Sequence, residues 1–384
     1  MLEEYIRNLG IEEDQQELIL SSYPICNYTE SNLLYTFKTL VNFLHRNGLD
    51  NTAIVNIITT CPNIITMSTE NIKERIKELF QYGFNKIEVF QMIENYPYII
   101  DMSNQRINNK YQLLEEIGFS NEDCNEIFVK KTEILNKDAS AIKKRVQFFL
   151  DYGYTKSSII PIIREIPNLL DMNQNSLNKK LEEYKDFGFT KEEIIKITTY
   201  LPELYIYNKE DIEAKTKYLT ENGYTTKNII NTIKKVPIVL KNNNLEKIEE
   251  NIDNLENLGF GISEIVPLTE KNPYILLYSK EIINDNFKEF IQCGITNSEV
   301  IKMMNQTPLL LTYNTKEIHK RLHYYKDKKL IEIIKENSKY VLYSLELILH
   351  REKYVKEKQD LFLTDQEFKK KYKISREELL KGAK

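Results

Sequence analysis

The chain has 384 residues, of which 41% are apolar, so it is long enough to bury a large core. Its 53 lysines and arginines against 57 aspartates and glutamates leave a formal charge of -4, which excludes the overall basicity of a protein that coats DNA. The four cysteines have no Cys-x-x-Cys spacing, and no apolar run reaches about 18 residues, which excludes a zinc ribbon, a disulfide framework and a membrane-spanning helix. We expect a soluble, cytoplasmic monomer without a signal or transit segment.

Glycine and proline recur along the chain at a fixed spacing. Nine of the 11 glycines are separated by steps of 35 to 38 residues, and eight of the ten prolines lie 14 residues after one of them. Thr132 stands where the remaining proline would be. The periodic glycines are Gly10, Gly48, Gly83, Gly118, Gly153, Gly188, Gly223, Gly259 and Gly294. A period of this length indicates tandem copies of one structural unit.

Each unit predicts a helix, a turn and a second helix. The first helix (helix A) begins at an N-cap residue just after the glycine and ends at the proline, which lacks an N–H group. The second helix (helix B) begins at another N-cap residue and runs to the next glycine, which suits a left-handed C-cap. The N-caps predicted for helix A are Asp50, Asn85, Ser120, Thr155, Thr190, Thr225 and Thr296. Those predicted for helix B are Ser68, Ser103, Asp138, Asn173, Asn208, Asn243, Ser279 and Asn314.

Two short amphipathic helices cannot bury their apolar stripes alone, so the units must stack. We therefore predict an all-α fold, an α-solenoid superhelix of about nine 35-residue helix-turn-helix repeats with capping ends. The repeat region spans 1–350, with a degenerate N-terminal repeat at 1–47 and a C-terminal cap at 329–350, and a basic helical tail spans 351–384. In the first repeat Cys26 and Asn27 replace the usual apolar pair, and in the cap Lys329 and Tyr343 occupy the glycine and proline positions.

Two prolines lie off the period, Pro161 and Pro267, each in the middle of a predicted helix A. Because proline removes a donor and crowds the preceding turn, we predict a kink or a late helix start in those two repeats.

The repeated unit resembles the repeats of the mitochondrial transcription termination factor (mTERF) family. Its order is a glycine with an aromatic residue, a helix, a proline, an apolar pair, an N-cap residue and a second helix. The resemblance covers about Gly10 to Lys371 and includes a tail in which Ser344-Leu345-Glu346 is followed by Arg351 and by the segment Leu361–Tyr372. It implies a superhelical solenoid that binds double-stranded DNA or structured RNA along a basic groove and affects transcription or RNA metabolism. Without an organellar presequence, we expect a bacterial-type member.

Charge is unevenly distributed along the chain. Residues 48–318 hold 32 basic and 39 acidic residues, whereas 319–384 hold 18 and 11, so a polyanion is expected to touch the C-terminal end first. A column of cations also recurs 27 residues after the glycine, in helix B. We call Arg75, Lys110, Arg145, Lys180, Lys215 and Arg321 the cationic column. Lys144, Lys179 and Lys320 precede column members by one position, and the tail adds Arg351.

Three interpretations of the column are open. Stacked repeats would place it on one face, where it could contact phosphates. Asn286 would then interrupt it, as would the 36-residue unit after Gly223, which has Glu250 or Asn251 at this position. Equally, the cations could lay their stems on the next helix or bond loop carbonyls of the adjacent repeat, or they could contact a peptide. The two functional hypotheses are accordingly a nucleic-acid binder and a protein-interaction scaffold that holds a peptide or protein partner.

We predict no enzymatic activity, no cofactor and no metal site. The glycines are used as helix C-caps, and neither a phosphate-binding loop nor a catalytic Cys or His signature is present. His319 and His323 are four residues apart on one helix face, as two zinc ligands would be, but nothing nearby in the sequence completes the shell.

Overall fold

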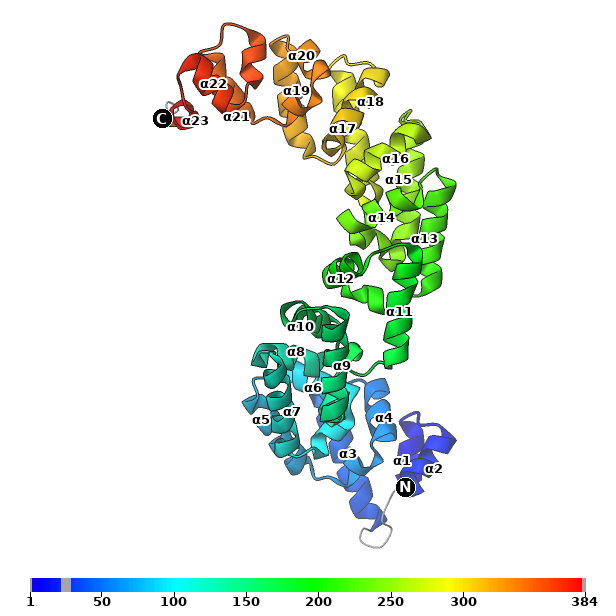
Figure 1. Ribbon diagram of the computed structural model, residues 1–384. Coiled ribbons are helices and arrows are strands. Elements are labelled where there is room, and N and C mark those ends of the chain that lie inside the picture. Colours follow the sequence, from blue (N-terminus) through cyan, green and yellow to red (C-terminus); the bar gives the residue numbers. More distant parts are fainter. Residues whose placement is uncertain (1, 22–28, 382–384) are drawn as a thin grey trace. The chain divides into compact units, whose positions relative to one another are not determined.

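The computed structural model describes residues 2–21 and 29–381, and these contain α-helices and short 3-10 helices but no strand (Figure 1). The all-α prediction is therefore confirmed. The predictions made for Pro24, Cys26 and Asn27 lie outside the described residues. The chain forms two compact units, Met1–Glu182 (unit 1) and Glu183–Lys384 (unit 2).

Unit 1 repeats the order helix A, 3-10 turn, helix B after an opening helix. Its elements are α1 (Leu2–Asn8), α2 (Glu13–Ser21), α3 (Glu30–Arg46), α4 (Asn51–Thr60), η1 (Pro62–Thr66), α5 (Thr69–Gln81), α6 (Lys86–Asn95), η2 (Pro97–Asp101), α7 (Asn104–Ile117), α8 (Asn121–Lys130), η3 (Thr132–Asn136), α9 (Ala139–Tyr152), α10 (Lys156–Glu165), η4 (Pro167–Leu170) and α11 (Gln174–Phe187). The boundary between the units falls within α11.

Unit 2 continues the same order and ends in a tail. Its elements are α12 (Lys191–Tyr200), η5 (Pro202–Tyr205), α13 (Lys209–Glu221), α14 (Thr226–Lys235), η6 (Pro237–Leu240), η7 (Asn242–Asn244), α15 (Leu245–Asn257), α16 (Ile262–Lys271), η8 (Pro273–Leu277), α17 (Lys280–Gln292), α18 (Asn297–Gln306), η9 (Pro308–Leu311), α19 (Thr315–Asp327), α20 (Ile331–Glu336), η10 (Ser338–Leu342), α21 (Leu345–Glu352), η11 (Lys358–Phe362), α22 (Asp365–Tyr372) and α23 (Arg376–Lys381).

The helix borders follow the predicted caps because capping depends on a few neighbouring residues. The Ser68 side chain, for example, accepts a bond from the backbone of Asn71, and Asn85 forms a capping box with Glu88. All nine periodic glycines have positive φ, from 83° to 120°, as the left-handed C-cap requires. The prediction for Asn243 is wrong: it lies in η7, and α15 begins one residue later than expected, after Asn244.

Proline is not essential at the turn, and a proline in the middle of helix A does not end that helix. At the one repeat without it, the Thr132 hydroxyl donates to the Phe128 carbonyl at 2.8 Å and the 3-10 turn forms as elsewhere. α10 and α16 begin five residues before Pro161 and Pro267 and continue through them, so the predicted late start is wrong. Each proline is the sixth residue of its helix, so the turn before it lacks one backbone hydrogen bond and yet stays helical.

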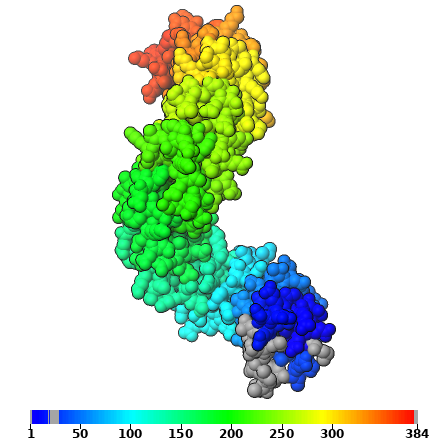
Figure 2. Space-filling model, turned by 90° about the vertical axis from the view of Figure 1, so that its right-hand side faces the viewer, coloured from blue at the N-terminus to red at the C-terminus, as the bar shows by residue number. Residues whose placement is uncertain are grey.

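The predicted C-terminal cap is a shortened repeat. Its helix A, α20, has 6 residues where α18 has 10, so the turn opens at Ser338 and not at the expected Tyr343. Lys329 takes the glycine position with a φ of 57°. The predicted boundary between 350 and 351 falls inside α21, and the tail packs on this helix through Leu347, Phe368 and Leu379. The tail residues (red) lie beside the preceding repeat (orange) in Figure 2.

Candidate nucleic-acid interface

The cationic column lies in helix B, and its side chains reach the 3-10 turn of the next repeat. Arg75 in α5 donates from Nε to the carbonyl of Ile99 at 3.3 Å, and from Nη1 to Glu78 at 2.7 Å. Nη1 also contacts the side-chain oxygen of Asn104, the first residue of the next helix B. The guanidinium therefore joins one repeat to the carbonyls and the second helix of the following repeat.

The same arrangement recurs in other repeats. The Lys110 ammonium donates to the carbonyl of Lys137, which follows η3. Arg321 donates from Nη1 to the carbonyl of Val341 in η10 at 3.1 Å, and its guanidinium lies 5.2 Å from the ring centroid of Tyr313. The last carbonyls of a short 3-10 helix have no partner within the helix, so a donor from outside must satisfy them when they are buried.

In the two repeats where the column lacks a cation, an asparagine donates hydrogen bonds to the carbonyls of the next turn. The fully buried Asn286 donates from Nδ2 to the carbonyls of Leu310, Leu311 and Tyr313 at 2.9 to 3.1 Å. Asn251 donates in the same way into the turn that follows it, at 3.0 Å. The prediction that Asn286 interrupts the column is therefore wrong, because the shared property of this position is an N–H donor and not a positive charge.

The middle of the column is less uniform. Lys215 is buried and donates from Nζ to the carbonyl of Asp211 in its own helix at 3.2 Å. Burial lowers the pKa of Lys215, and it lowers the pKa of Arg145 as well, with Asp171 acting in the opposite direction. Arg145 and Lys180 are half-buried. Among the described residues, Lys215 and Arg145 share the location of the column but not the bond to the next turn.

The expected open face of cations is not what the structure contains. Arg75, Lys110, Lys215, Arg321 and Arg351 are only 1% to 7% exposed. A buried cation needs hydrogen bonds to offset its lost hydration, and four of these five obtain them from carbonyls of the following segment. The interpretation that the column lies on an open face for phosphate contact is therefore wrong for its buried members. Arg75, Lys110 and Arg321 instead bond carbonyls of the adjacent repeat.

The lysines one position before the column remain available to a ligand. Lys144, Lys179 and Lys320 are exposed, because one residue along a helix turns the side chain by about 100° away from the packed face. No ion pair of Lys144 or Lys179 occurs within residues 2–21 and 29–381, whereas Lys320 lies 3.4 Å from Glu317. These three keep the predicted geometry for phosphate contact.

Arg351 organises the tail in the way that the column organises the repeats. Its Nη1 donates to the carbonyl of Leu361 at 3.0 Å and to that of Leu363, and its Nη2 pairs with Asp365 at 2.7 Å. The guanidinium also lies 4.6 Å from the ring centroid of Phe368. Burial lowers the pKa of Arg351, while Asp365 opposes this. A side chain of α21 therefore bonds the carbonyls of the η11 turn, as the column residues do in the repeats. Here, however, no helix A lies between the helix and the turn.

The surface around Arg351 is rich in lysine. Within the described part of the chain, no acidic partner lies in ion-pair distance of five exposed lysines of this region. They are Lys353, Lys356, Lys369, Lys370 and Lys373, which we call the tail lysines. Lys371, in contrast, pairs with Asp360 at 2.6 Å, which raises its pKa. The basic run at 369–371 indicated this region from the sequence, but only the folded tail separates its free cations from its paired one.

A shallow groove of about 360 Å³ lies next to the tail, between α19 and α21. Lys320 and Lys353 contribute to its lining, together with Glu317, Glu346 and His350. It thereby brings one of the lysines beside the column together with one of the tail lysines, which are 33 positions apart in the sequence. The mixed charge of the lining suits contact with a phosphate at the lysine side of the groove.

Comparison with known proteins bears on this surface. The family model for mTERF matches the chain in three overlapping segments, residues 2–151, 101–232 and 207–368. The last segment includes α19, α21 and most of the tail. No curated protein matches the chain. In the described part of the chain, no helix combines the length and the apolar character needed to cross a membrane.

Proposed function

Because this chain belongs to the mTERF family, whose members are in general nucleic-acid-binding helical-repeat proteins and not enzymes, we propose that it binds double-stranded DNA or structured RNA. The observation that carries the proposal is the set of exposed tail lysines without acidic partners. Lys320, which lines the same groove as Lys353, adds a phosphate contact to this set. By this binding the protein regulates transcription or RNA metabolism.

Recognition in this proposal is electrostatic and tolerant of sequence. Lysine contacts a phosphate as a point charge and reads no base. Each contacted phosphate releases condensed counterions, so five tail lysines on a duplex predict a slope of about -4.5 in a plot of log affinity against log salt. The acidic remainder of the chain repels a polyanion, which confines contact to the C-terminal region of unit 2.

The test compares two variants with the same change in net charge. In one, Lys353, Lys369, Lys370 and Lys373 are replaced by glutamate, and in the other the same is done at exposed lysines elsewhere. The control set is Lys77, Lys86, Lys156 and Lys227. Binding to duplex DNA, a structured RNA and single-stranded DNA is measured from 50 to 200 mM salt.

We expect the tail variant to lose binding at least a hundredfold more than the control variant and to flatten the salt slope. Equal losses in the two variants would mean that the tail lysines act only through the net charge of the protein and do not form a binding site. A chain that binds none of the three nucleic acids at 50 mM salt would overturn the proposal.

A protein-interaction scaffold is the second candidate. The residue after the turn-opening proline is large, apolar and about half exposed in three repeats, namely Tyr98, Tyr274 and Leu309 at 46% to 50%. Exposed apolar side chains at a repeated position suit a protein partner better than a polyanion. Binding of a partner through them would persist at 200 mM salt and would be lost on replacing Tyr274 and Leu309 with alanine.

A further inference from the structure

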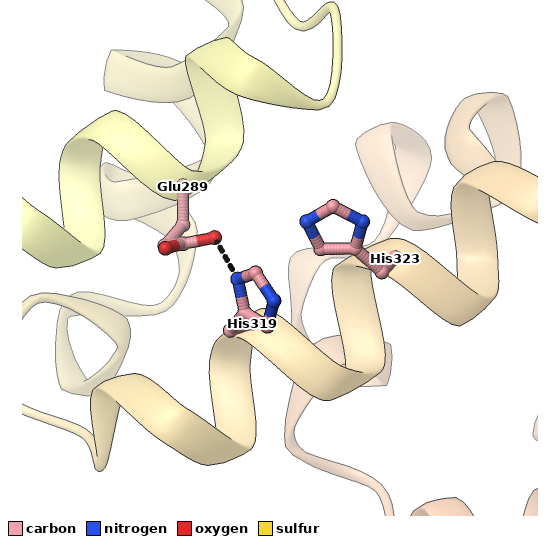
Figure 3. A group of neighbouring side chains, drawn as sticks. All are labelled: Glu289, His319 and His323. Carbon is pink, nitrogen blue, oxygen red and sulfur yellow. Dashed lines mark hydrogen bonds and ion pairs between the residues drawn. The ribbon is translucent and has the colours of Figure 1, made fainter.

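Two exposed histidines of α19 face each other at the surface of unit 2. His319 and His323 are one turn apart, and their ring centroids are 4.1 Å from each other (Figure 3). His319 is 51% exposed, and no hydrogen bond of His323 occurs among the described residues. Histidines at positions i and i+4 of a helix are a recurrent arrangement for chelating a divalent metal ion.

A carboxylate from the preceding repeat completes a set of three donors. Glu289 in α17 reaches His319 with its carboxylate oxygen 2.8 Å from Nδ1. One donor atom from each of Glu289, His319 and His323 lies within 4.8 Å of the other two. The sequence prediction of no metal site missed this group, because Glu289 precedes His319 by 30 residues and only the stacking of α17 against α19 brings them together.

We propose that Glu289, His319 and His323 form a site for a borderline first-row divalent cation of the zinc type. Two imidazole nitrogens and one carboxylate oxygen are the donor set of open zinc sites, in which water takes the fourth position. Imidazole disfavours Mg²⁺ and Ca²⁺, which take oxygen ligands. The exposed His323 ring needs only a side-chain rotation to bring its nitrogen to bonding distance from a shared ion.

The ion would join two consecutive repeats. Stability in a repeat protein depends on nearest-neighbour interfaces, so a metal held by α17 and α19 stiffens one interface without touching the others. It also places positive charge beside Lys320 on the surface of the same helix. The proposal stands on the geometry of these three side chains and does not depend on nucleic-acid binding.

The test titrates ZnCl₂ into the full-length, EDTA-treated protein by calorimetry, with MgCl₂ as a second titrant, and records the visible spectrum with Co²⁺. We expect one Zn²⁺ per chain, an increase in the melting temperature and no response to Mg²⁺. His319→Gln, His323→Gln and Glu289→Gln should each weaken Zn²⁺ binding at least about tenfold. The matched control is His350→Gln, which removes one of the two histidines outside the group and should bind Zn²⁺ as the parent does.

Circular dichroism should show that each variant is folded, because both histidines are exposed and Glu289 is only partly buried. The proposal is overturned if the parent shows no Zn²⁺ heat and no Co²⁺ spectrum at 100-fold excess of metal. It is equally overturned if the double variant of His319 and His323 binds Zn²⁺ as tightly as the parent.

Discussion

Replacing Arg351 with methionine should release the C-terminal tail while leaving the repeats folded. Methionine keeps much of the apolar stem over Phe368 but removes the donors to the carbonyls of Leu361 and Leu363 and to Asp365. A buried acceptor left without a donor costs about 1–3 kcal/mol, and breaking a buried charge network costs about 3–5 kcal/mol in all. At 1.4 kcal/mol for each factor of ten, local opening of the tail should rise by at least about a hundredfold.

Hydrogen exchange followed by mass spectrometry measures this opening, because a repeat protein unfolds locally and a single global free energy would average over it. Peptides from α22 should lose protection in the Arg351→Met variant, while those from α4 to α10 should not change. Arg376→Met is the matched control, since Arg376 is exposed and also pairs with Asp365, at 3.2 Å. Its effect should stay below about 0.5 kcal/mol. Unchanged protection of α22 in Arg351→Met would refute the structural role assigned to this side chain.

Four further outcomes follow from the same geometry. Asn286→Asp replaces a side chain that donates to three carbonyls with a carboxylate, which should destabilise the repeat by more than about 3 kcal/mol. This is measured as loss of hydrogen-exchange protection in η9. Asn286→Lys introduces the residue found at this position in other repeats and should destabilise less. Gly188→Ala should lower the melting temperature, because φ is 111° and the new Cβ would lie 3.0 Å from a side-chain carbon; an unchanged melting temperature would contradict this. Burial raises the pKa of Cys124 to about 12, so iodoacetamide should leave it unmodified in the native protein at pH 8 and alkylate it in urea, as peptide mapping would show. The bond to Lys335 lowers the pKa of Glu299 from 4.5 to about 2. The stability that Glu299 contributes to the fold is therefore complete above pH 4.5 and is lost as the pH falls toward 2. In Glu299→Gln, the melting temperature should fall less steeply with pH over this range.

The column illustrates how far a repeated position can be interpreted from sequence. Its recurrence in helix B was visible, and both a phosphate role and a carbonyl role fitted the spacing. Because Asn286 carries no charge, it counted as a gap, although its amide makes the same bonds as the neighbouring cations. Hydrogen-bond donation is shared by lysine, arginine and asparagine, and only the structure identifies it as the common property of the position.

The candidate metal site could not be predicted from the sequence for a similar reason. Two histidines at i and i+4 were noted, but the third donor belongs to another repeat. Glu289 precedes His319 by 30 residues, so the sequence pattern alone does not place the two side chains together. Likewise, the run of lysines at 369–371 was visible, while the pairing of Lys371 with Asp360 depends on how η11 packs against α22.

By itself the sequence determined the order and number of the repeats and most helix borders. These depend on glycine at positive φ, on proline at turns and on N-cap side chains, all of which act within a few residues. Tertiary structure alone decided which cations are buried and which are free. That outcome depends on the rotation of each helix about its axis as it stacks on its neighbour, where one residue of offset separates the buried Arg321 from the exposed Lys320.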